Sequence, residues 1–294
     1  MLKIETIQQK HKNGIYLLLE ILNKTDNLGY SLTDQWLDYI IQAKRESVFL
    51  AMDKENLIGI ATCMISETDN THAVLNIAIH PKYRKQGIGS ELNDRAMNYM
   101  KEKNIKTVES YVKKRLKRSL EFAEKRGFDP MLYAWQMDLN VRKMKKDLTN
   151  FKDTALTFRQ ATVKDNHTYA NIINHTFGDA LDQNVLGEML KDPSIRVYIL
   201  KRKGKVIGSA TVQLRINLSL GYIYDVAIVE QYRGQGFGSY LLKKCIEELC
   251  TFNIATASLT VTGQNKQALG LYHKLGFKEV DTDIILEYIK NYKN

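Results

Sequence analysis

The chain repeats one sequence pattern at a constant spacing of 149 residues. The segment Arg84–Gly89 recurs as Arg233–Gly238, and Gly127-Phe128 recurs as Gly276-Phe277. Because these widely separated landmarks keep the same spacing, the repeat indicates duplication of a whole domain and not the chance recurrence of a short turn. The chain is therefore constrained to fold as two similar domains in tandem.

Length and composition agree with this organisation. A chain of 294 residues has room for two domains of ordinary size, and 44% hydrophobic with 26% charged residues is typical of globular proteins. No apolar stretch reaches the roughly 20 residues that cross a bilayer, and the N-terminus lacks a signal-peptide pattern. We therefore expect a cytoplasmic protein without a membrane partner. The three cysteines lack metal-ligand spacing, which predicts neither a metal site nor a disulfide framework.

Both halves have the same predicted order of elements, with domains over residues 1–145 and 154–294. Apolar alternation predicts strands at residues 2–7, 48–52, 57–65, 73–79, 107–112 and 132–139, and again at 156–160, 197–200, 205–212, 222–228, 257–261 and 284–289. Helical periodicity is expected at 15–22 and 32–43 and after each glycine-rich segment. We expect an α+β fold in which each domain has a mixed, mostly antiparallel, twisted sheet flanked by helices.

The glycine-rich segment of each half connects a predicted strand to a predicted helix. Glycines such as Gly236 and Gly238 allow a ligand to approach the backbone, and the first N–H groups of the helix then point at that ligand. Such a turn suits an anion, above all a pyrophosphate. A P-loop and a dinucleotide fingerprint are both excluded, since neither copy has their spacing of glycines, lysine and hydroxyl residues.

Arg-x-x-Gly-x-Gly between a strand and a helix resembles the acyl-CoA signature of the GNAT (GCN5-related) N-acetyltransferase superfamily. The resemblance extends over most of both halves, and it implies two tandem domains that use acetyl-CoA as co-substrate. It implies that Ile228 and Val229 contact the pantetheine arm and the thioester. It also implies a pyrophosphate site made by Arg233, Gly234, Gln235, Gly236, Phe237, Gly238 and Ser239, which the first half matches with Arg84, Gly87 and Gly89, among others.

A second motif distinguishes the two halves. Asn265 and Tyr272, ahead of Gly276-Phe277, resemble the family pattern in which the asparagine positions CoA and the tyrosine hydroxyl protonates the departing thiolate. At the same spacing the first half has Leu116 and Ala123, which offer no polar group. The resemblance therefore implies a catalytic C-terminal domain and an N-terminal domain that is non-catalytic or binds CoA weakly.

The general base is less well specified by the sequence. The attacking amine must be neutral, so a carboxylate, a histidine or a water relay near the fourth strand of the second half could accept its proton. Tyr224 and Asp225 lie on that strand and Glu230 follows it. We take Asp225 as the candidate base and leave the other groups open.

The predicted function is transfer of an acetyl group from acetyl-CoA to a primary amine of a small molecule or peptide, by direct attack. An alternative is a non-catalytic acyl-CoA sensor. A third hypothesis is an RNA- or ribosome-associated protein, because residues 101–126 contain ten Lys or Arg against four Glu. A solvated helix face accounts for that charge equally well, so nucleic acid is the less favoured partner.

Overall fold

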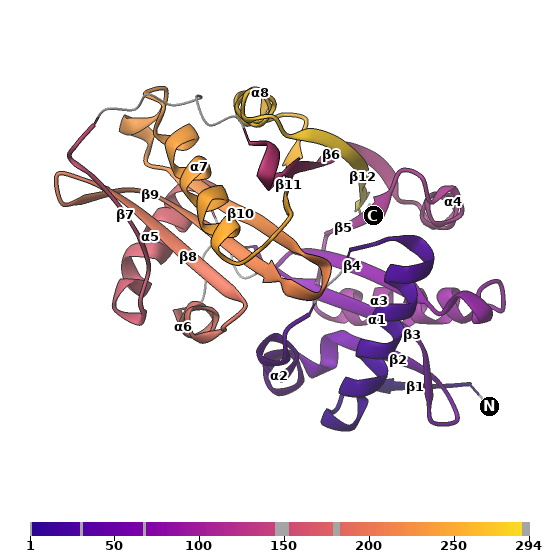
Figure 1. Ribbon diagram of the computed structural model, residues 1–294. Coiled ribbons are helices and arrows are strands. Elements are labelled where there is room, and N and C mark those ends of the chain that lie inside the picture. The colour runs from indigo at the N-terminus through magenta and orange to yellow at the C-terminus, as the bar shows by residue number, and fades with distance from the viewer. Residues whose placement is uncertain (1, 30–31, 67–68, 145–152, 179–182, 290–294) are drawn as a thin grey trace. The chain divides into compact units, whose positions relative to one another are not determined.

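The computed structural model describes residues 2–29, 32–66, 69–144, 153–178 and 183–289 (Figure 1). The chain forms two compact units: unit 1 comprises Met1–Leu132 and Asp283–Asn294, and unit 2 comprises Tyr133–Thr282. The predicted boundary between the halves, residues 146–153, lies outside the described residues except for residue 153. Each unit has the predicted α+β architecture, and the predicted order of strands and helices is confirmed.

Unit 1 places helices on both faces of its sheet. Its elements are β1 (Leu2–Thr6), η1 (Gln9–His11), α1 (Lys12–Asp26), α2 (Asp34–Ala43), η2 (Arg45–Ser47), β2 (Val48–Asp53), β3 (Asn56–Ile65), β4 (His72–Ile79), η3 (Pro81–Tyr83), α3 (Ile88–Glu102), β5 (Thr107–Lys113), α4 (Lys117–Glu124) and the start of β6 (Asp129–Asn140). The strand order is β1-β2-β3-β4-β5-β12, and β4 and β5 are the parallel neighbours. One apolar cluster includes Leu92 of α3, and another includes Ile15 of α1 and Leu37 of α2.

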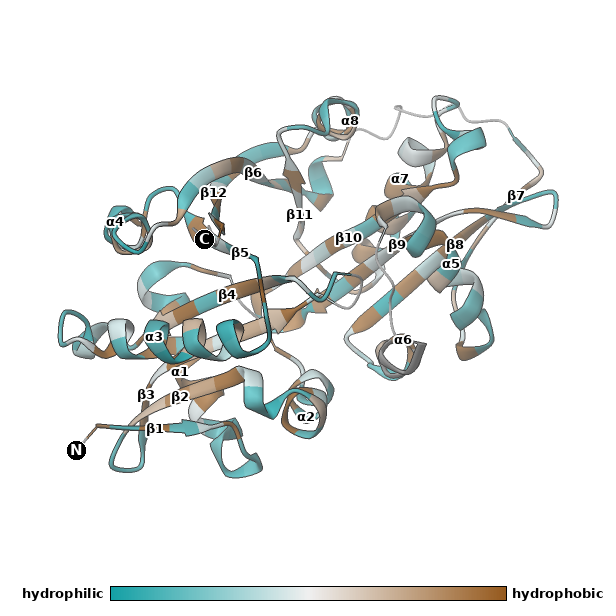
Figure 2. Ribbon diagram, turned by 180° about the vertical axis from the view of Figure 1, so that it is seen from behind, coloured by the Kyte–Doolittle hydropathy of each residue, from teal (hydrophilic) through white to brown (hydrophobic). Residues whose placement is uncertain are grey.

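Unit 2 repeats this arrangement. Its further elements are η4 (Val141–Lys143), β7 (Leu156–Gln160), η5 (Val163–Asp165), α5 (Asn166–Phe177), α6 (Gln183–Lys191), β8 (Ile195–Arg202), β9 (Lys205–Arg215), η6 (Ile216–Leu218), β10 (Leu220–Ile228), η7 (Glu230–Tyr232), α7 (Phe237–Thr251), β11 (Thr256–Thr262), α8 (Lys266–Leu275) and β12 (Lys278–Ile289). The strand order is β6-β11-β10-β9-β8-β7. Figure 2 shows long hydrophobic stretches along β10 and β8. The apolar stripe of α7, from Leu241 to Leu249, is buried.

The two units exchange their last strands. β6 follows the helices of unit 1 in the chain but pairs antiparallel with β11 of unit 2, with Ala134 opposite Thr262. β12 follows the helices of unit 2 but pairs antiparallel with β5 of unit 1, with Asp283 opposite Lys113. These pairs are related by the same spacing of 149 residues, so the exchange is reciprocal. The sequence pattern, in which each half is continuous, does not indicate it.

Candidate active site

The parallel strand pair at the centre of each sheet separates along its length. β10 pairs with β11 only from Leu220 to Tyr222, although β10 continues to Ile228 (Figure 1). In unit 1, β4 pairs with β5 only from His72 to Val74 and continues to Ile79. Each sheet therefore opens between its parallel strands, beside the glycine-rich turn. This opening is where the resemblance predicts the pantetheine arm.

The glycine-rich turn of unit 2 is exposed and is shaped by two residues with left-handed backbone. Gly234 has φ 74° and Gly236 has φ 87°, and α7 begins immediately after Gly236. A Cβ atom at Gly234 would meet no atom within 4 Å, so the space beside this glycine is open. The N–H groups of the first turn of α7 are suited to bind an anion there. The Phe237 side chain is buried in the core, so only its backbone can line this site.

Side chains fix both turns in the same way. Arg233 Nε donates to the Ile228 carbonyl at 2.9 Å, and Arg84 Nε donates to the Ile79 carbonyl at 3.1 Å. Lys85 stands at the position of Gly234 and has φ 64°, at a cost of about 1 kcal/mol for a residue with a side chain. Both halves thus retain the geometry of the turn.

The arginines of the two turns differ in their remaining contacts. Arg84 Nη1 donates to Asp26 Oδ1 at 3.1 Å, and its Nη2 donates to Asp26 Oδ2, so the guanidinium binds the end of α1. Arg115, in the loop before α4, donates to the Asn27 carbonyl at 2.8 Å. Within the described part of the chain, Arg233 has no ion pair. The end of α1 therefore connects the two loops on either side of the opening in unit 1.

Tyr272 lies on α8 and is buried, with 8% of its surface exposed. Burial raises the pKa of Tyr272 to about 12, and nearby Tyr222 adds to the increase. The phenol is therefore protonated at neutral pH and can donate a proton. Asn265 begins the same helix, and its Oδ1 accepts a hydrogen bond from the Ala268 N–H at 3.0 Å. Its carbonyl oxygen thus fixes the start of α8.

Asp225 lies at an irregularity in β10. The register with β9 shifts between Tyr224 and Ala227, so that β10 contains one extra residue, and Asp225 has φ 51°. Tyr169 of α5 donates to Asp225 Oδ2 at 3.0 Å and lies 2.7 Å from Thr211 Oγ1. Tyr169 and Thr211 are fully buried. The sequence prediction missed these two partners. Ile15, the fourth residue of α1, corresponds to Tyr169, the fourth residue of α5, and offers no hydroxyl.

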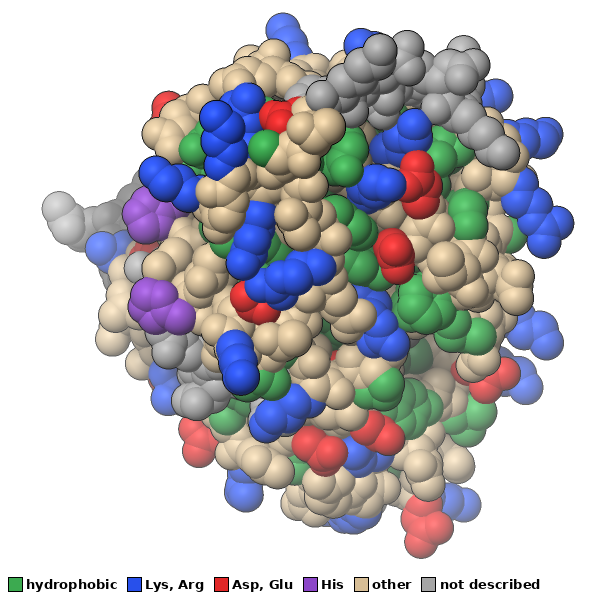
Figure 3. Space-filling view, turned by 60° about the vertical axis from the view of Figure 1, so that its left-hand side comes forward, with side chains coloured by type: hydrophobic (Ala, Val, Ile, Leu, Met, Phe, Trp, Pro, Cys, Tyr) green, Lys and Arg blue, Asp and Glu red, His purple; other side chains and the backbone are tan. Residues whose placement is uncertain are grey.

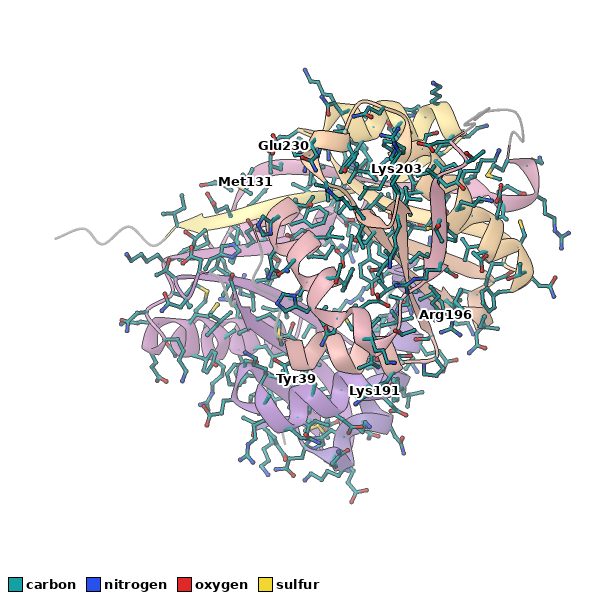
Figure 4. The ribbon with its side chains drawn as sticks, turned by 90° about the vertical axis from the view of Figure 1, so that its left-hand side faces the viewer. Tyr39, Met131, Lys191, Arg196, Lys203 and Glu230 are labelled. Carbon is teal, nitrogen blue, oxygen red and sulfur yellow. The ribbon has the colours of Figure 1, made fainter. Side chains whose placement is uncertain are left out.

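The other candidate bases occupy different surroundings. Glu230 is exposed at the start of η7 and is labelled in Figure 4. Tyr224 is adjacent to Asp225, and burial raises its pKa above the usual range for tyrosine. Asp192 is buried in the turn between Lys191 and Arg196, both labelled in Figure 4, and its Oδ1 accepts from Ser194. Of these carboxylates, Asp225 is the one that lies on β10 itself.

The basic segment at residues 101–126 is partly used inside unit 1. Lys113 is buried in an ion pair with Asp283, Arg115 binds the Asn27 carbonyl, and the Arg126 guanidinium lies 3.6 Å from the centre of the Phe122 ring. On the face of the molecule in Figure 3, Lys and Arg side chains are interspersed with Asp, Glu and hydrophobic ones. Several charges of the segment therefore have structural partners.

The described residues contain no group of His, Cys, Asp and Glu side chains that could hold a metal ion. None of the helices in the described ranges is long and apolar enough to span a membrane.

Comparison with known proteins gives a consistent result. A model of the acetyltransferase (GNAT) family matches residues 15–128 and 162–277. A mycothiol acetyltransferase from Paenarthrobacter aurescens is 22% identical over 244 residues, covering 79% of this chain and 74% of that protein. The [ribosomal protein bS18]-alanine N-acetyltransferase of Escherichia coli is 35% identical over 82 residues, covering 28% and 54%. The structure of a tandem GNAT protein from the clavulanic acid biosynthesis pathway aligns over 100% of both chains, with a TM-score of 0.75 and 12% identity.

Proposed function

Because this chain belongs to the acetyltransferase (GNAT) family, we propose that it transfers an acetyl group from acetyl-CoA to a primary amine of a small molecule or peptide, and that unit 2 catalyses the transfer. The family membership rests on the two matched segments, one in each half. Acetyl-CoA supplies the activated acetyl group. The residues of unit 2 bind it, position the amine and move the protons.

The buried hydroxyl of Tyr272 carries this proposal. Its pKa of about 12 keeps it protonated, and it lies on α8, the helix that follows β11. We propose that its hydroxyl faces the sulfur of bound acetyl-CoA. A neutral donor near the sulfur lets the thiol group leave without formation of a free thiolate. Unit 1 has Ala123 at this position and Leu116 in place of Asn265, so it lacks the donor.

The strand irregularity at Asp225 supports the same assignment. β3 and β4 of unit 1 pair without a register shift from Gly59 to Ile65, and Asn76 pairs with Thr62 as Tyr224 pairs with Thr211. The irregularity at Asp225 therefore has no counterpart in β4. β10 contains an extra residue next to the opening, and this turns its backbone and side chains out of the regular strand pattern. Such irregularities recur beside active sites because they redirect a side chain. We propose that Asp225 accepts the proton that the acceptor amine loses.

The contacts at the end of α1 support a non-catalytic unit 1. Asp26 neutralises Arg84, the arginine that precedes the turn glycines, and the Asn27 carbonyl binds Arg115 on the opposite loop. A bound anion would have to compete with the Asp26 carboxylate for the Arg84 guanidinium. We propose that unit 2 holds the stronger acetyl-CoA site, through Arg233 and the exposed turn at Gly234 and Gly236.

The proposed step balances as follows. Asp225 accepts one proton from the acceptor ammonium, and the nitrogen lone pair forms a bond to the acetyl carbonyl carbon as the carbon–sulfur bond breaks. Tyr272 gives its proton to the sulfur, and the second proton that leaves the nitrogen returns to the Tyr272 phenolate through solvent, which restores the phenol. The products are an amide and CoA thiol, and one proton is released from Asp225 to solvent. The nucleophile belongs to the acceptor, so no serine or cysteine nucleophile is required.

Amine-dependent release of CoA thiol tests the proposal. The amines tested should include small primary amines and peptides with a free N-terminal alanine, because the relatives include a mycothiol acetyltransferase and a ribosomal-protein alanine acetyltransferase.

With an amine that the protein acetylates, we expect Tyr272→Phe to lower kcat by about 10²–10⁴-fold. Tyr99→Phe removes a partly buried tyrosine hydroxyl in unit 1 and serves as the matched control. Turnover of Tyr272→Phe within twofold of the parent would contradict the acid role. Binding of acetyl-CoA without release on any amine would favour the sensor hypothesis.

A further inference from the structure

A directed chain of hydrogen bonds connects β9, α5 and β10 in unit 2. Thr211 Oγ1 lies 2.7 Å from the Tyr169 hydroxyl, and that hydroxyl lies 3.0 Å from Asp225 Oδ2. Thr211 and Tyr169 are both fully buried, whereas Asp225 is half-buried. The chain therefore extends from the protein interior to a carboxylate at the edge of the strand opening.

The chemistry of the three groups fixes the direction of the protons. Burial raises the pKa of Tyr169 well above its usual value, and the nearby Asp225 carboxylate raises it further. The phenol is thus neutral and has one proton to donate. An ionised carboxylate can only accept, so Tyr169 donates to Asp225 and Thr211 donates to the Tyr169 oxygen. A hydrogen bond to the charged form stabilises a carboxylate as the anion.

This arrangement is confined to unit 2. Ile15, the fourth residue of α1, corresponds in unit 1 to Tyr169, the fourth residue of α5. Asn76 pairs with Thr62 as Tyr224 pairs with Thr211, so the irregularity at Asp225 has no counterpart in β4. Among these positions, only Asp225 has a left-handed backbone. A residue with a side chain stays in that region only where the surroundings hold it there. The buried tyrosine therefore does more than fill space beneath the sheet.

We propose that Tyr169, supported by Thr211, is a positioning residue that holds the Asp225 carboxylate at the β10 irregularity, where it binds the acceptor as an ammonium ion and takes its proton. The inference rests on the proposed function and adds two residues to its machinery. It also assigns a chemical class to the acceptor, namely an amine that is cationic when it enters the site.

Other charged and titratable groups surround this carboxylate. Tyr224 adjoins it on β10, and the pKa values of Tyr169 and Tyr224 are both raised by the charge of Asp225. The charge of Asp192, in the turn before β8, raises the pKa of Tyr224, and the charge of Arg215, on β9, lowers it. A change at Tyr169 removes one hydrogen bond and leaves these charges in place, so its effect on the pH profile reports on that hydrogen bond.

The test compares Tyr169→Phe, Thr211→Val and Thr211→Ser with the parent full-length chain. We expect Tyr169→Phe to lower kcat by about tenfold. It should also move the acid limb of the pH profile, the range in which kcat rises with pH, upward by about half to one pH unit, because the Asp225 carboxylate loses the hydrogen bond from the Tyr169 hydroxyl. Acetyl-CoA affinity should stay within twofold. Thr211→Val should cause a smaller shift in the same direction, and Thr211→Ser, which retains the hydroxyl, should restore the parent profile.

The outcomes separate this inference from the proposed function. If Tyr169→Phe keeps the parent kcat and acid limb while Asp225→Asn and Tyr272→Phe are inactive, the positioning role is wrong and the function stands. If the parent transfers acetyl to no amine, the proposed function fails first. If Tyr169→Phe does not fold, Thr211→Val decides: a shifted acid limb with unchanged acetyl-CoA affinity supports the inference, and an unchanged limb overturns it.

Discussion

Lys113 Nζ donates a hydrogen bond to Asp283 Oδ2 at 3.0 Å, although 170 residues separate them in the chain. Lys113 ends β5, and Asp283 lies on β12 opposite it. The Lys113 side chain is 6% exposed and the Asp283 side chain 18%, so the ion pair is largely shielded from water. It fastens the exchanged strand to the sheet of unit 1. Unit 2 has Thr262 and Ala134 at the corresponding positions, without charges.

Removal of one partner of this ion pair should destabilise the protein. We expect Asp283→Ala to lower the free energy of unfolding by about 1–3 kcal/mol, because the buried ammonium of Lys113 is left uncompensated. The double variant Lys113→Met with Asp283→Leu should recover most of the loss, since apolar residues of similar volume need no partner. Urea denaturation of the three proteins measures this, and equal stability of the single variant and the parent would contradict it.

The reciprocal strand exchange predicts that the halves of the sequence do not fold separately. A fragment of residues 154–294 lacks β6, so the long strand β11 becomes an unpaired edge, and residues 1–145 lack β12 beside β5. Exposed edges of this kind favour association and aggregation. We expect each fragment alone to be aggregated or unfolded, and the two together to form a soluble complex. A cooperative, monomeric unfolding transition for either fragment alone would disagree with this view.

Calorimetric titration with acetyl-CoA compares the two glycine-rich turns. We expect one strong site for each chain. Arg233→Ala should weaken its affinity by about 10-fold or more, the effect of a lost charge-assisted hydrogen bond. Arg84→Ala is the matched control 149 residues away, and its effect should stay within twofold, because Arg84 is already neutralised by Asp26. Two equivalent sites, or a larger effect of Arg84→Ala, would show that unit 1 binds the cofactor as well.

The raised pKa of Tyr272 predicts how stability depends on alkaline pH. The ordinary tyrosine pKa is 10.0, and in the folded protein that of Tyr272 is about 12. Between these values the unfolded chain loses the proton while the folded chain keeps it, so stability falls as pH rises from 10 to 12. The contribution is fully present below pH 10. Thermal denaturation of the parent and of Tyr272→Phe should therefore show a shallower alkaline decline for the variant. If the stability of the parent and of the variant fell equally with rising pH, the raised pKa of Tyr272 would not be the cause of the alkaline decline.

Several features could be predicted because they depend on local sequence. The constant spacing of Gly127-Phe128 and Gly276-Phe277 identified the duplication. The strand–turn–helix order around Gly234 and Gly236 predicted a glycine turn suited to an anion, and the anion itself stays a prediction. Left-handed backbone at both glycines confirms the geometry of that turn. The functional roles given to Tyr272, Asn265 and Asp225 stay predictions, and the experiments above test them.

The sequence by itself determined the type and order of the elements, because apolar periodicity and glycine positions act within a few residues of each other. Only the tertiary structure decided which partners these elements have. β6 and β12 arise from the same repeated pattern, yet β6 pairs with β11 and β12 pairs with β5. Backbone pairing between distant segments therefore decides the exchange. The contacts of Tyr169 with Asp225 and of Asp26 with Arg84 likewise join side chains 56 and 58 residues apart. Such contacts depend on how helices pack against the sheet, and no local pattern specifies that packing.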